Sequence, residues 1–171
     1  MRYWPNSAEI PLIRAPTEIP HNVINIFTDG SNMGGKVGAA AVIIKDDIIL
    51  HQSMFKLHER CSNNQAEQVA ILSALEHIQN LQLAEDAEKI AVVNTDSKVT
   101  LDALQNRNKH YILTESIRKE IKRLEDLQWT VFSNWVKANV RIQGNEMADR
   151  LAKKAATESI GEKIYDKIPR L

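Results

Sequence analysis

Three short apolar runs stand out in the N-terminal part of the chain. Residues 23–27 form the first run, which ends at Asp29-Gly30-Ser31. Two further runs, residues 37–44 and 48–55, are separated only by Lys45-Asp46-Asp47. Apolar runs of this length between turn-forming residues are typical of buried strands, and the short separation indicates a hairpin. The pattern therefore predicts three strands in an antiparallel meander.

The pattern changes after Ser62, where apolar residues recur at the spacing of an α-helix. The residues that carry this repeat are Ala66, Val69, Ala70, Leu72, Ala74, Leu75 and Ile78. Beyond this helix, strands are predicted over residues 90–93 and 129–136, and Trp129 and Trp135 on the second are expected to be core or sheet-face residues. Further helices are predicted over residues 98–104, 114–127 and 144–156. Strands followed by alternating strands and helices predict a mixed α/β sheet.

The two ends of the chain lack these patterns. Residues 1–21 hold four of the five prolines and show no sustained period, which indicates a linker or leader. Residues 159–171 form a short polar stretch that we expect to be a C-terminal tail. A single domain is therefore expected over residues 22–158, a length that suffices for a buried core.

Composition narrows the class of protein. Apolar residues make up 43% of the 171 residues and charged residues 26%, as in ordinary globular proteins. No apolar run approaches the roughly 20 residues that span a bilayer, so no membrane partner is expected. The single cysteine, Cys61, favours a reducing intracellular setting, in the cytoplasm or the nucleus. The net charge of zero argues against a module that holds nucleic acid by charge alone.

Acidic residues lie where the predicted strands end and where the predicted helices start. Asp29 follows the first strand and Asp96 the fourth, while Glu67 and Asp149 lie in the first turns of two helices. Ligands of open α/β sheets gather at the carboxyl ends of strands, so these side chains can converge there. A cluster of carboxylates is tolerated when hard divalent cations such as Mg²⁺ or Mn²⁺ neutralise it. Two such ions about 4 Å apart support phosphodiester hydrolysis, whereas any one of these acids taken alone is more often a solvated surface group.

The sequence around these acids resembles, in order, the four motifs of the ribonuclease H family. The matching words are FTDGS at residues 27–31, SNNQAE at 62–67, NTDS at 94–97 and GNEMADRLA at 144–152. This resemblance implies the ribonuclease H-like α/β fold, a five-stranded mixed sheet of three antiparallel and then two parallel strands with helices on both faces. The last motif, with Gln143 before it, is most similar to the version in non-LTR retrotransposons, where the domain follows a reverse transcriptase.

The resemblance also implies a reaction, which is cleavage of the RNA strand of an RNA–DNA hybrid with two Mg²⁺ ions, for which Mn²⁺ can substitute. Asp29 would bridge both ions, Glu67 and Asp96 would complete one site each, and Asp149 would help to hold the ion that activates water. The isolated domain is expected to be a monomer.

The resemblance also implies that residues in and just before the second motif bind the substrate. Asn63 and Asn64 match family residues that contact ribose 2′-hydroxyl groups, which distinguish RNA from DNA. Arg60 and Ser62 resemble the positions that grip a phosphate of the DNA strand. Helix capping is an alternative explanation for Ser62 and Asn63, and both roles can hold at once.

The chain departs from the family in two places. Asn139 stands where the family usually has a histidine, which the resemblance implies moves protons and helps to release product. An amide cannot titrate near neutral pH and cannot replace that function, so slow cleavage is expected. Residues 106–111 hold no extended basic helix of the kind that some members use to bind the hybrid, which predicts weak hybrid affinity without a neighbouring polymerase. The mixed charges of residues 117–124 indicate a packed helix with a solvated face.

Three alternatives remain open on the sequence alone. Other nucleases, integrases and transposases share this fold, because a fold does not determine a function. A degenerate domain that binds hybrid or serves as a polymerase scaffold is the second alternative, and Asn139 gives it some weight. The third is a cellular ribonuclease H rather than a retroelement domain.

Overall fold

The computed structural model describes residues 22–106, 108–109, 111–137, 143–158 and 162–165. Asn139 lies outside the described residues, as do the whole of the expected leader and much of the expected tail. The elements along the chain are β1 (Ile24–Met33), β2 (Lys36–Lys45), β3 (Ile48–Leu57), α1 (Asn63–Ile78), β4 (Ile90–Thr95), α2 (Lys98–Gln105), α3 (Ile112–Asp126), β5 (Thr130–Trp135), α4 (Gln143–Thr157) and β6 (Glu162–Tyr165).

The strands form one mixed sheet in the order β5-β4-β1-β2-β3-β6. Strands β1, β2 and β3 are antiparallel neighbours, and β4 and β5 extend the sheet in parallel on the other side of β1. The predicted arrangement of three antiparallel and then two parallel strands is confirmed. The sixth strand was not predicted, because its four residues fall within the expected tail and are too few to show a repeat. Strand β6 is defined by parallel pairing with the end of β3, at Phe55–Leu57.

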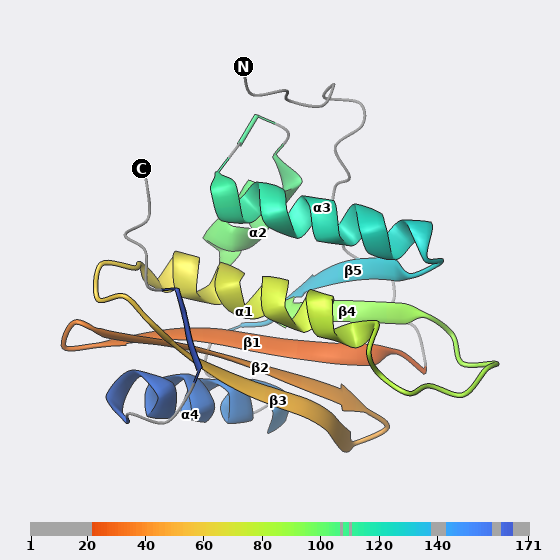
Figure 1. Cartoon of the computed structure of the whole chain (residues 1–171), viewed down its shortest axis with the longest axis horizontal. Coiled ribbons are helices and arrows are strands. Elements are labelled where there is room, and N and C mark those ends of the chain that lie inside the picture. The colour runs from red at the N-terminus through yellow and green to blue at the C-terminus, as the bar shows by residue number, and fades with distance from the viewer. Residues whose placement is uncertain (1–21, 107, 110, 138–142, 159–161, 166–171) are drawn as a thin grey trace.

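Helices cover both faces of the sheet, as the resemblance implied. Helices α1, α2 and α3 lie on one face, and α4 crosses β1, β2 and β3 on the other (Figure 1). Helix α1 packs on β1 and β2 and is covered in turn by α3. Among the described residues, no helix has both the length and the apolar character needed to cross a bilayer.

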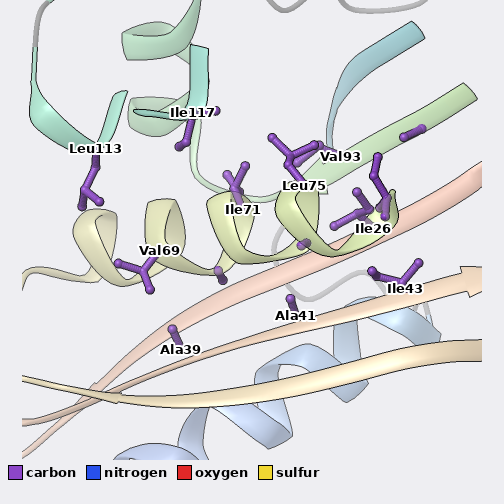
Figure 2. Close-up of a cluster of buried hydrophobic side chains, with 14 of the residues drawn as sticks. Ile26, Ala39, Ala41, Ile43, Val69, Ile71, Leu75, Val93, Leu113 and Ile117 are labelled. Atoms are coloured by element: carbon purple, nitrogen blue, oxygen red, sulfur yellow. The ribbon is translucent and has the colours of Figure 1, made fainter. Parts of the chain in front are cut away.

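The main hydrophobic core lies between the sheet and α1. Ile26 and Ile43 of the sheet and Ile71 and Leu75 of α1 belong to this core, and each of these four side chains is fully buried. Ile71 points away from the sheet, towards Ile117 of α3 (Figure 2). Burial of a side chain of this size contributes roughly 1.5–3 kcal/mol, so this layer fixes α1 firmly on the sheet. Trp129 also joins this core, as expected, whereas Trp135 is 47% exposed.

Arg118 of α3 points into the protein rather than towards solvent. Its guanidinium donates hydrogen bonds to the backbone oxygens of Ala103 and Asn106 at the end of α2 and to Glu115 Oε1, at 2.7, 2.6 and 2.7 Å. Only 2% of Arg118 is exposed. The solvated face predicted for residues 117–124 is therefore wrong at this position, because the last carbonyl groups of α2 need donors and Arg118 supplies them.

Candidate metal centre and active site

Strand register brings Asp29 and Asp96 together. Strands β1 and β4 are parallel neighbours, and Phe27 pairs with Asn94. Each aspartate lies two residues beyond this pair, so both reach the same edge of the sheet on the same face. The predicted end of the first strand at Asp29 is wrong, because β1 continues to Met33 through its pairing with β2. The two carboxylates still converge, because Asp29 lies level with the end of β4.

A glycine lets α1 approach the same edge. A Cβ atom added to Gly30 would lie 2.6 Å from the backbone oxygen of Asn63, so no larger residue fits without a shift. This close contact places the start of α1 against β1. Glu67, in the second turn of α1, thereby lies against the middle of β1, beside Asp29, and is only 2% exposed.

Three of the four predicted carboxylates form a compact triad. One carboxylate oxygen from each of Asp29, Glu67 and Asp96 lies within 4.8 Å of the others. Asp149 of α4 adjoins this triad, close enough to Asp29 to raise the pKa of that carboxyl group. Helix α4 comes close because Gly38 of β2 leaves room for its backbone, where an added Cβ would lie 2.4 Å from Ala152 O. The structure therefore brings all four predicted acids into one site.

Two threonines hold the buried Glu67. The hydroxyls of Thr28 and Thr95 both donate to Glu67 Oε1, the second at 2.7 Å. Each threonine precedes one of the aspartates, so strand alternation turns its side chain to the opposite face, towards α1. The sequence analysis did not identify these two threonines. The Thr-Asp pair that is repeated after two apolar runs could have indicated that the threonines share a role beside the aspartates.

Burial and mutual repulsion raise the pKa values of the three triad carboxyl groups. Burial, followed by the charge of Glu67 and the contact with Asp149, raises the pKa of Asp29 to about 8. Burial raises the pKa of Glu67 to about 7, and the two threonine hydrogen bonds oppose that rise. Burial also raises the pKa of Asp96, and the charge of Asp149 adds to this. Since the donors are all carboxylate oxygens and their charges repel one another, the site suits a hard divalent cation.

The predicted substrate residues lie around the start of α1. Ser62 caps this helix, since its hydroxyl accepts from Gln65 N at 3.1 Å and its own N–H donates to Gln65 Oε1 at 2.8 Å. The capping role is therefore confirmed for Ser62. Asn63 and Arg60 are exposed beside it. Asn64 Oδ1 accepts a hydrogen bond from Ser97 Oγ at 3.1 Å, which ties α1 to the loop that carries Asp96.

Two residues that the sequence did not single out for this site border Asp96. The indole N–H of Trp135 donates to Asp96 O at 3.2 Å, and Lys98 Nζ lies 5.2 Å from the centre of the indole ring. The hydrogen bond links the end of β5 to the backbone of a triad residue. An exposed indole and an exposed lysine therefore lie at the rim of the site.

Comparison with known proteins agrees with this geometry. A family model described as RNase H matches residues 21–157. The chain belongs to the ribonuclease H family. The chain is 27% identical over 146 residues to a protein named Ribonuclease H from Wolbachia sp. subsp. Drosophila simulans (strain wRi), covering 80% of this chain and 97% of the relative. It is also 27% identical over 144 residues to a Ribonuclease H of Wolbachia pipientis wMel, with 78% and 95% of the two chains covered.

Proposed function

We propose that the protein hydrolyses the RNA strand of RNA–DNA hybrids with two divalent cations, Mg²⁺ or Mn²⁺, held by the four carboxylates. The observation that carries the proposal is the triad of Asp29, Glu67 and Asp96, whose oxygens lie within 4.8 Å of one another at the carboxyl edge of the sheet. Membership of the ribonuclease H family supports the choice of substrate.

Each carboxylate has a proposed role. Asp29 would contact both cations because it belongs to the triad and also adjoins Asp149. Glu67 and Asp96 would complete one site each, and Asp149 would help to hold the ion beside the attacking water. When bound, such a pair of cations lowers the pKa of a water molecule and stabilises the leaving oxygen.

The protein's own groups orient the site and the substrate. Thr28 and Thr95 both donate to Glu67 Oε1, so one oxygen of this carboxylate is fixed before any ligand binds. We propose that Asn63 and Asn64 contact ribose 2′-hydroxyl groups and that Arg60 and Ser62 contact a phosphate of the DNA strand. The position of all four residues around the start of α1, next to Gly30, supports this assignment.

The finer parts of the proposal concern turnover and context. We expect slow multiple turnover, because Asn139 stands where the family usually has a histidine that moves protons. We also propose that the domain works beside a reverse transcriptase in a retroelement. The reverse transcriptase would bind the hybrid and so compensate for the weak affinity of this domain. The support for this context is the last motif, residues 143–152, together with the lack of an extended basic segment at residues 106–111.

A cleavage assay on labelled substrates tests the proposal. The full chain is incubated with RNA–DNA hybrid, duplex RNA and duplex DNA in Mg²⁺, in Mn²⁺ and in EDTA, with Asp96→Asn as the inactive control. We expect metal-dependent cleavage of the hybrid RNA strand alone, leaving 5′-phosphate and 3′-hydroxyl ends. Cleavage of duplex DNA would instead favour another nuclease of the same fold. Binding of hybrid without any cleavage would favour a scaffold.

A further inference from the structure

We propose that Lys153 competes with the second divalent cation for Asp149, so that the two cation sites differ in affinity. This inference rests on the proposed two-cation function. It makes Lys153 a positioning residue, which acts through Asp149 rather than on the substrate.

The geometry of α4 supports the competition. Asp149 and Lys153 lie one helical turn apart, and Lys153 Nζ is 2.9 Å from Asp149 Oδ2. Asp149 also lies beside Asp29, whose pKa it helps to raise. Asp149 therefore lies between another carboxyl group of the site and an ammonium group. The charge of Asp29 also acts on Lys153, so the ammonium group senses the metal centre beyond its direct partner.

The four carboxylates are not equally available to a cation. Oxygens of Asp29, Glu67 and Asp96 already converge within 4.8 Å, and Asp149 is not part of that triad. A first cation can therefore bind the triad without disturbing α4. A second cation that takes an oxygen of Asp149 meets the ammonium group at that carboxylate, and two cations so close together repel each other.

The ion pair is weak enough to exchange. Lys153 and Asp149 are 53% and 47% exposed, and ion pairs at such positions contribute little to stability because water screens them. A divalent cation can therefore displace the lysine at a modest loss of affinity. We expect removal of the lysine charge to tighten the weaker cation site about three- to tenfold.

Titration with Mn²⁺ tests this without substrate or turnover. Binding is followed by the electron paramagnetic resonance signal of free Mn²⁺ for the wild-type chain, Lys153→Met, Lys153→Arg and Lys154→Met. Methionine keeps most of the aliphatic stem but not the charge, arginine keeps the charge, and Lys154 is an exposed lysine at the next position of the same helix. We expect a tighter weak site in Lys153→Met and wild-type binding in the other two variants.

The outcomes separate this inference from the proposed function. A Lys153→Met isotherm that matches the wild type, or shows weaker binding, contradicts the competition even if the wild type binds Mn²⁺ and cleaves hybrid. If the wild type shows a single class of site, the appearance of a second class in Lys153→Met supports the competition and its absence contradicts it. No Mn²⁺ binding at all by the wild type contradicts the proposed function itself. A circular dichroism melt of each variant confirms that it is folded.

Discussion

Replacing Asp29 with asparagine is expected to stabilise the metal-free protein at neutral pH. Burial and the neighbouring carboxylates raise the pKa of Asp29 from 3.8 to about 8. The folded state therefore binds this proton more tightly than the unfolded state does. The stability that protonated Asp29 contributes is complete at a pH below its pKa in the unfolded state, and it is lost as the pH rises towards its pKa in the folded state. Asparagine keeps the shape of the side chain and never ionises.

The size of the effect follows from the shift. One pKa unit corresponds to about 1.4 kcal/mol, so the cost of folding with Asp29 ionisable is about 4 kcal/mol at pH 7 and less than about 2 kcal/mol at pH 5. Asp29→Asn should therefore gain about 2–3 kcal/mol more over the wild type at pH 7 than at pH 5. Saturating Mg²⁺ should remove most of the difference by neutralising the triad in the wild type.

Urea unfolding in EDTA measures this directly. The wild type, Asp29→Asn and the control Asp102→Asn, an exposed aspartate of α2, are unfolded at pH 5 and pH 7 and followed by circular dichroism. The reasoning is refuted if the gain of Asp29→Asn is the same at both values, or if Asp102→Asn shows an equal change with pH.

Four further predictions each concern a single residue. Thr95→Val removes a donor to Glu67, so the pKa of Glu67 should rise further and hybrid cleavage should fall about tenfold, with a larger loss at pH 6.5 than at pH 8.5 in initial-rate assays. Burial and the imidazole of His77, stacked at 3.6 Å, lower the pKa of His51. The stability of the fold should therefore fall as the pH drops below about 6.5, where the unfolded state binds the proton more readily. Thermal melts in Mg²⁺ should show a smaller loss of stability at low pH for His51→Gln than for the wild type. Arg118→Met leaves the carbonyl groups at the end of α2 without their donor and should cost about 3–5 kcal/mol in urea unfolding; a cost below about 1 kcal/mol would show that the arginine is dispensable. Asn139→His should raise multiple turnover more than single-turnover cleavage, and no change in either would exclude a role for this position.

Sequence patterns were sufficient for the order of the elements. Three apolar runs and the turn residues Lys45-Asp46-Asp47 predicted the meander, and the structure confirms it. The four acids could be singled out because each follows an apolar run or lies in the first turns of a predicted helix, and such places face the ligand-binding edge of an open sheet. Strands, turns and helix starts depend mainly on residues that are close together in the chain, so they can be predicted from the sequence.

Other features depended on which elements become neighbours. The role of Thr28 and Thr95 exists only because α1 brings Glu67 between β1 and β4, and the burial of Arg118 only because α2 ends beside α3. Strand β6 likewise needs the open edge of β3 as its partner.

The sequence by itself thus determined the order of the strands and helices from β1 to α4 and the set of acids that the protein can offer a cation. Only the tertiary structure decided that Asp29, Glu67 and Asp96 form the compact triad while Asp149 is paired with Lys153. The physical reason is that a carboxylate's partners are set by distances of a few ångströms between segments far apart in the chain, and those distances arise from packing at residues such as Gly30 and Gly38.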